Sequence, residues 1–240
     1  MVVMEKVIFI DIPKCATTSI YNVLRDKFWD TEGHFLHKHV PLIMYPEAIR
    51  TSLKIVTCTR NPYDRMVSIW KYYNKLRCTW HEIDPGTPSA KNDGHRKSAL
   101  AYIDRVKTFE AFVDDCYERN LEIDNARVKG IPGEQKGGMD IIQESFKMFR
   151  NFNEFPYNDV FRKSMTCMLY GPPTWFIIRY ENLQEDINLL CKKLNWPEVK
   201  IPKINVSGGP SFLDYYNQDT LKKVNHIFYW DFLSCNYKMK

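Results

Sequence analysis

The sequence has few of the features that mark a membrane, secreted or metal-binding protein. No run approaches the roughly 18 apolar residues of a membrane-spanning helix, and the apolar run near the N-terminus covers only Val7 to Ile10. The seven cysteines are odd in number and never stand in CxxC spacing, which argues against a zinc ribbon or a disulfide framework. We therefore expect free thiols in a soluble, cytoplasmic protein, although a Golgi lumenal domain without its anchor would have the same composition.

An excess of one charge is also missing. Lysine and arginine together number 34 and aspartate and glutamate 29, which gives a formal net charge of +5. This balance mildly favours anionic ligands and does not indicate nucleic acid as a partner. No compact cluster of acidic residues is present, so we expect no bound metal. With 44% hydrophobic residues and no internal repeat, residues 1–240 are expected to form one domain.

Glycine is missing from the first loop, where a nucleotide-binding loop would usually carry it. Val7 to Ile10 is a β-branched apolar run, and apolar residues at helical spacing continue to Leu24. The residues between them suit an anion at a helix start, because unpaired N–H groups and the helix dipole meet there. The pattern is not GxxxxGK(S/T), since the lysine does not adjoin the hydroxyl residues. The expected anion-binding residues are Lys14, Cys15, Ala16, Thr17, Thr18 and Ser19.

A second strand–loop–helix unit follows. Leu53 to Thr59 is rich in β-branched residues and stops at Arg60, after which Asn61 fits an N-cap and Pro62 the first helical residue. The guanidinium of Arg60 can fork onto a phosphate, and Ser68 carries a hydroxyl two turns into the helix. These two residues predict a second anion site, and two anion sites suggest a ligand with two separated phosphates.

A third unit completes the pattern. Thr174 to Ile178 reads as a strand that ends at the segment 179–182, and Leu183 to Leu194 repeats apolar residues at helical spacing. Repeated strand–helix units predict an α/β fold with a parallel sheet flanked by helices, whose strand ends share one ligand-binding edge. Other expected elements are a short helix over 42–50, a long surface loop over 77–98, helices around 109–116 and 139–149 joined by a linker over 130–138, a loop over 205–210 and one helix over 220–232.

These segments resemble the sulfotransferases that use 3′-phosphoadenosine 5′-phosphosulfate. Residues 12–19 look like the family's 5′-phosphosulfate-binding motif, and residues 60–68 look like its 3′-phosphate-binding motif. Residues 37–41 resemble the short Lys-x-His-x-Pro segment that carries the catalytic base in soluble members. The resemblance also covers residues 179–182 and the terminal pattern of Asp231, Phe232 and Tyr237, but we could not align residues 77–138.

The resemblance implies a P-loop nucleotide-kinase-like fold, a nucleotide sulfuryl donor and no metal. It implies that Lys14 contacts the bridging oxygen and the 5′-phosphate, while residues 15–19 supply backbone and hydroxyl donors. Arg60 and Ser68 would hold the 3′-phosphate, Tyr180 would border the nucleotide, and His39 would take the proton from a hydroxyl or amine of a carbohydrate or small molecule. The product would be 3′-phosphoadenosine 5′-phosphate, and an insertion around 77–138 would shape the acceptor site.

Several alternatives stay open at this point. His34 and His37 compete with His39 as the base, and a histidine metal site lacks a third ligand. Arg60 could instead pair with Asp64 or Glu181. The soluble branch carries an Arg-Lys-Gly element near its C-terminus. Residues 203–209 occupy the corresponding place here, with Ser207 as a candidate substitute. The residues of the second motif are closer to those of the carbohydrate-modifying branch. A nucleotide or small-molecule kinase and an inactive nucleotide- or glycan-binding module are the rival functions.

Overall fold

The computed structural model describes residues 7–24, 39, 41–82, 104–128, 165–169, 171–202 and 211–240. By contacts the chain divides into two compact units, and we describe each by itself. The first unit comprises Met1–Arg65, Lys163–Asp214 and Phe228–Lys240, and the second comprises Met66–Arg162 and Tyr215–Ile227. That residues 1–240 act as one domain stays a prediction.

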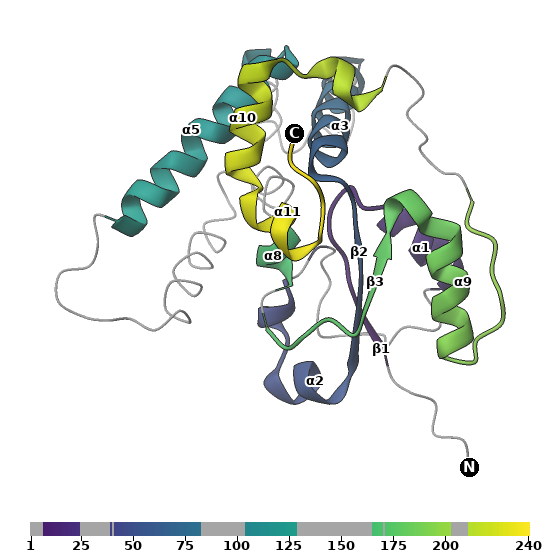
Figure 1. Ribbon diagram of the computed structural model, residues 1–240. Coiled ribbons are helices and arrows are strands. Elements are labelled where there is room, and N and C mark those ends of the chain that lie inside the picture. Colours follow the sequence, from purple (N-terminus) through teal and green to yellow (C-terminus); the bar gives the residue numbers. More distant parts are fainter. Residues whose placement is uncertain are drawn as a thin grey trace. The chain divides into compact units, whose positions relative to one another are not determined.

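A parallel sheet forms the centre of the first unit (Figure 1). Its three described strands are hydrogen-bonded in the order β1-β2-β3, and the register pairs Val7 with Lys54 and Thr59 with Arg179. Each strand leads into a helix, as parallel strands with crossover connections require. The three units thus confirm the predicted α/β fold. The elements are β1 (Val7–Ile10), α1 (Thr17–Leu24), β2 (Lys54–Thr59), α3 (Pro62–Glu82), β3 (Phe176–Arg179), the 3₁₀ turn η4 (Tyr180–Asn182) and α9 (Leu183–Lys193).

Both faces of the sheet are covered, which explains why β1 is an uninterrupted buried apolar run. Alternate strand residues face the two sides. On one side Phe9 and Ile178 pack with Ile20 of α1 and Leu190 of α9 in one buried cluster, and Figure 1 shows these two helices on the same side of the sheet. On the other side residues 8, 10 and 55 pack against residues 42 and 45, which belong to or adjoin the 3₁₀ turn η2 (Leu42–Met44).

The remaining described elements complete the two units. In the first unit, α2 (Glu47–Ser52) precedes β2. The first backbone N–H of α8 (Met165–Met168) donates to the carboxylate of Asp231 in α11 (Tyr229–Ser234). In the second unit, α5 (Phe109–Val128) packs against α10 (Gln218–Ile227). The ammonium of Lys223 lies 2.8 Å from Asp114 across that helix pair. The 3₁₀ turn η5 spans Phe212–Tyr215.

Three predicted element boundaries are wrong. The single helix over 42–50 is a 3₁₀ turn and a separate helix, because Pro46 cannot continue a first helix and is the N-cap of the second, which begins at Glu47. The loop expected from Arg77 is helical as far as Glu82, so α3 is longer than predicted. The single helix over 220–232 is two helices that meet at Phe228, which has non-helical φ and ψ of −112° and 25°. The elements expected over 130–138, 139–149 and 205–210 lie outside the described residues.

Candidate functional site

The loop after β1 has an unusual backbone. Lys14 and Ala16 have positive φ values of 67° and 58°, whereas Cys15 between them does not. Such alternation turns successive backbone N–H groups toward one point, an arrangement that commonly binds anions. The carbonyl of Ala16 accepts the first hydrogen bond of α1 from Ile20 at 3.1 Å, so the loop leads directly into a helix N-terminus. The geometry therefore suits the predicted anion-binding role.

The hydroxyl residues of this loop occupy the first turn of α1. Thr17 and Ser19 are buried and Thr18 is exposed, while Lys14 and Ala16 are half-buried. Cys15 is fully buried, with its sulfur near the carbonyl of Pro13. Burial raises the pKa of the Cys15 thiol to about 12 even though two nearby arginines oppose the shift. The thiol is consequently neutral near pH 7 and is not a nucleophile.

Two arginines that follow β2 hold the loop in place. Arg60 donates from Nη1 to the carbonyl of Lys14 at 3.1 Å, and Arg65 donates from Nε to the carbonyl of Pro13 at 3.1 Å. Arg65 is completely buried and Arg60 is 7% exposed. The two guanidinium groups place positive charge next to the loop, which favours an anionic ligand, and Asp64 offsets part of the charge of Arg60.

Arg60 also forms a forked ion pair with Asp64. Its Nε lies 2.8 Å from Oδ2 and its Nη2 lies 2.9 Å from Oδ1. Burial alone would lower the pKa of Arg60, but the hydrogen bonds and charge of Asp64 outweigh burial and raise it. A guanidinium has five N–H donors, and Asp64 and Lys14 together engage three of them. Arg60 can therefore keep both partners and still donate to a phosphate.

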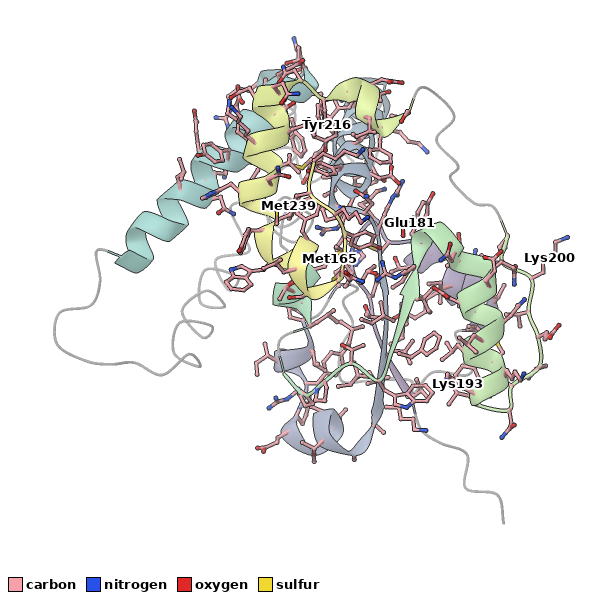
Figure 2. All side chains as sticks on the ribbon, in the orientation of Figure 1. Met165, Glu181, Lys193, Lys200, Tyr216 and Met239 are labelled. Carbon is pink, nitrogen blue, oxygen red and sulfur yellow. The ribbon has the colours of Figure 1, made fainter. Side chains whose placement is uncertain are left out.

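The ring of Tyr180 stacks against the guanidinium of Arg60. The carbon at the centre of the guanidinium is 3.9 Å from the centre of the Tyr180 ring, which is stacking distance. The next residue, Glu181, is labelled in Figure 2 near the start of α9, and its Oε1 accepts the backbone N–H of Asn61 at 2.7 Å. Its Oε2 accepts the hydroxyl of Tyr237 at 3.0 Å. These contacts join the carboxyl ends of β2 and β3.

His39, the predicted base, lies at the end of β1. Its Nδ1 is 3.1 Å from the Oδ1 of Asp11 and 3.3 Å from the backbone oxygen of the same residue. His39 has a positive φ of 67° and a side chain that is 20% exposed. The competing residues His34 and His37 lie outside the described residues.

The structure thus brings most of the predicted site residues to one edge of the sheet. Lys14 to Ser19, His39, Arg60 and Tyr180 all belong to the first unit, whereas Ser68 is a half-buried residue of α3 in the second unit. Sequence reasoning missed Asp11 and Arg65. A signal existed for Asp11, since a carboxylate that directly follows four buried strand residues stands at a ligand-binding edge.

The donors of the site suit an anionic group. In the part of the chain that the structure describes, no group of three or more histidine, cysteine or acidic side chains could hold a metal ion. The converging N–H groups near Lys14 and the remaining donors of Arg60 suit phosphate and sulfate oxygens.

A family comparison agrees with this geometry. A model of the sulfotransferase domain matches residues 5–195, which is most of the chain. The chain belongs to the sulfotransferase family. The site of this sulfotransferase falls within the match, from Asp11 to Glu181. No match was found among curated proteins, and none among solved structures. None of the helices described is both long and apolar enough to cross a bilayer.

Proposed function

We propose that this sulfotransferase moves a sulfuryl group from 3′-phosphoadenosine 5′-phosphosulfate to a hydroxyl, or alternatively an amine, of a carbohydrate or small molecule. The contact between Arg60 and Lys14 carries the proposal, because it joins the two anion-binding segments into one positive site at the edge of the sheet. A donor with a 5′-phosphosulfate and a 3′-phosphate would engage both segments at once.

Each segment takes one end of this donor. Lys14 and the N–H groups of residues 16–19 bind the 5′-phosphosulfate, and the hydroxyls of Thr17, Thr18 and Ser19 supply further donors. The N–H of Cys15 donates to the carbonyl of Ile12 at 3.3 Å, so Cys15 contributes through the shape of the loop. Arg60 and Ser68 bind the 3′-phosphate. Support for the arginine comes from the two N–H donors that its described contacts with Asp64 and Lys14 leave over, and from the ring of Tyr180, which stacks on the guanidinium.

The reaction is an in-line displacement at sulfur. His39 accepts the proton of the acceptor hydroxyl while the new bond from that oxygen to sulfur forms. The bond from sulfur to the bridging oxygen breaks, and Lys14 stabilises the negative charge that develops on the departing phosphate. Positioning and charge stabilisation of this kind are the main contributions to transfer of phosphoryl groups, which sulfuryl transfer resembles. The chain's own groups suffice for these steps.

A screen for sulfate transfer tests the proposal. Radiolabelled sulfate in the donor is offered with glycans, phenols, sterols and amines as acceptors, and label should move to at least one class. A second arm offers ATP with magnesium. Phosphate transfer there, without sulfate transfer, would replace the proposal by a kinase, whereas tight donor binding without transfer to any acceptor would favour an inactive binding module.

A further inference from the structure

Asp11 is a buried carboxylate that the proposed reaction does not yet use. Its side chain is 5% exposed, and it follows directly after the last residue of β1. In the described part of the chain, neither of its carboxylate oxygens accepts a hydrogen bond of good geometry. A buried carboxylate in this condition is costly, so a functional reason for it should be sought.

The ring of His39 faces this carboxylate. Nδ1 of His39 lies 3.1 Å from the carboxylate and directs its hydrogen bond to the backbone oxygen of Asp11 at 3.3 Å. Both atoms that face Nδ1 are hydrogen-bond acceptors. Nδ1 must therefore be the nitrogen that carries the proton in the neutral ring, and Nε2 the nitrogen with the lone pair.

We propose that Asp11 is a positioning residue for His39: its backbone oxygen holds the ring in the tautomer with Nε2 basic, and its carboxylate stabilises the ring when Nε2 becomes protonated. This inference rests on the proposed function, in which His39 is the base. The acceptor proton moves to Nε2, and the Nδ1 proton stays in place. A carboxylate beside a histidine base has this effect in other enzymes as well.

The neighbouring titratable groups do not replace His39 as the base. Burial and the charge of Asp11 raise the pKa of Tyr45 to about 12, and burial raises that of Cys15 to about 12. Both are protonated near neutral pH and cannot take a proton. The other charges that act on Cys15 are those of Arg65, Arg60 and Asp231, and the Asp231 carboxylate is engaged by the N–H groups of Met165 and Thr166.

The tautomer can be measured in the unaltered protein. The ¹⁵N chemical shifts of the His39 ring, assigned by comparison with His39→Gln, should show a protonated Nδ1 and an unprotonated Nε2 near neutral pH. The opposite tautomer would overturn the proposal. This measurement needs no acceptor and no variant of Asp11.

Kinetics of Asp11→Asn provide the second test, with Asp214→Asn as the matched control because Asp214 is exposed and outside the site. With the hydroxyl acceptor found in the screen, Asp11→Asn should lower kcat by about 10²-fold, the usual effect of losing general-base assistance. Its KM and its affinity for 3′-phosphoadenosine 5′-phosphate should stay within about threefold. In a His39→Ala background the same change should have almost no effect, because both residues serve one step.

The outcomes separate this inference from the proposed function. Failure of the unaltered protein to bind 3′-phosphoadenosine 5′-phosphate in calorimetry would contradict the proposed function. Normal binding with unchanged kcat in Asp11→Asn would overturn the role of Asp11 alone. An equal loss of kcat in the wild-type and His39→Ala backgrounds would also overturn it, since that result indicates a general structural effect.

Discussion

Nη1 of Arg60 lies 3.1 Å from the backbone oxygen of Lys14, so a side chain from the end of β2 holds the loop at the end of β1. The two segments that the sequence predicts to bind anions are therefore in direct contact. Substitution of Arg60 should disturb the Lys14 loop as well as the second anion site, and each effect can be measured with its own ligand.

Arg60→Ala should weaken binding of adenosine 5′-phosphosulfate, which lacks the 3′-phosphate, by about three- to tenfold, because the loop loses a charge-assisted hydrogen bond. It should weaken binding of 3′-phosphoadenosine 5′-phosphate by more than about 10²-fold. Calorimetry with both ligands measures the difference. Arg105→Ala, an exposed arginine in the second unit, serves as the control. Unchanged affinity for the ligand without the 3′-phosphate would mean that Arg60 does not order the loop.

Asp231 should be a major determinant of stability. It is completely buried, and its carboxylate accepts hydrogen bonds from the backbone N–H of Met165 and Thr166, both at 2.8 Å, and from the Thr166 hydroxyl at 3.0 Å. Figure 2 labels Met165 next to α11. Asp231→Ala leaves these donors without an acceptor and should lower the free energy of unfolding by about 2–4 kcal/mol.

Urea denaturation measures that change. Asp231→Asn keeps one acceptor oxygen and should cost about half as much, and exposed Asp214→Asn should cost less than about 0.5 kcal/mol. An equal free energy of unfolding for Asp231→Ala and the unaltered protein would show that α8 does not depend on the hydrogen bonds to Asp231.

Stability should fall at alkaline pH because of buried thiols. Burial raises the pKa of Cys15 from 9.0 to about 12, so between these values the folded protein keeps a proton that the unfolded chain releases. The stabilisation is therefore full below about pH 9 and is lost as the pH rises toward about 12, by at most about 1.4 kcal/mol per pH unit. Cys15→Ala should reduce the slope of unfolding free energy against pH between about pH 9 and about pH 10. Parallel slopes in urea titrations of the two proteins would contradict this origin.

His39→Ala should separate binding from turnover. In the proposed reaction His39 accepts a proton and does not hold the nucleotide, so its loss should leave the affinity for 3′-phosphoadenosine 5′-phosphate unchanged and reduce sulfate transfer by at least about 10²-fold. His226→Ala, an exposed histidine on α10, is the matched control. Near-normal turnover in His39→Ala would move the role of base to His37 or His34.

The sheet and its loops could be predicted because their signals are local. A β-branched run, a loop and a helical pattern each occupy a few consecutive residues. The predicted N-cap is one example: the side chain of Asn61 accepts the backbone N–H of Tyr63 at 3.0 Å, just before α3 begins at Pro62. The break at Pro46 was equally local and could have been predicted from the missing N–H of proline.

The partners of the site residues could not be predicted, because they are distant in sequence. His39 contacts Asp11 from 28 positions away, and Arg65 reaches Pro13 across 52 positions. Only the folded sheet brings these segments together, since parallel strands align residues that no local pattern links. The pair of Arg60 and Asp64 is the exception: it spans four positions on one helix start and was considered from the sequence.

The most direct test is titration of 3′-phosphoadenosine 5′-phosphate into the protein and into Lys14→Ala by isothermal calorimetry. Lys14 supplies the full charge at the loop, so the unaltered protein should bind the nucleotide and Lys14→Ala should lose more than about 10²-fold in affinity. Lys200→Ala, an exposed lysine labelled in Figure 2, should bind as the unaltered protein does. Equal affinity in all three proteins, or no binding by the unaltered one, would contradict a nucleotide site at the end of β1.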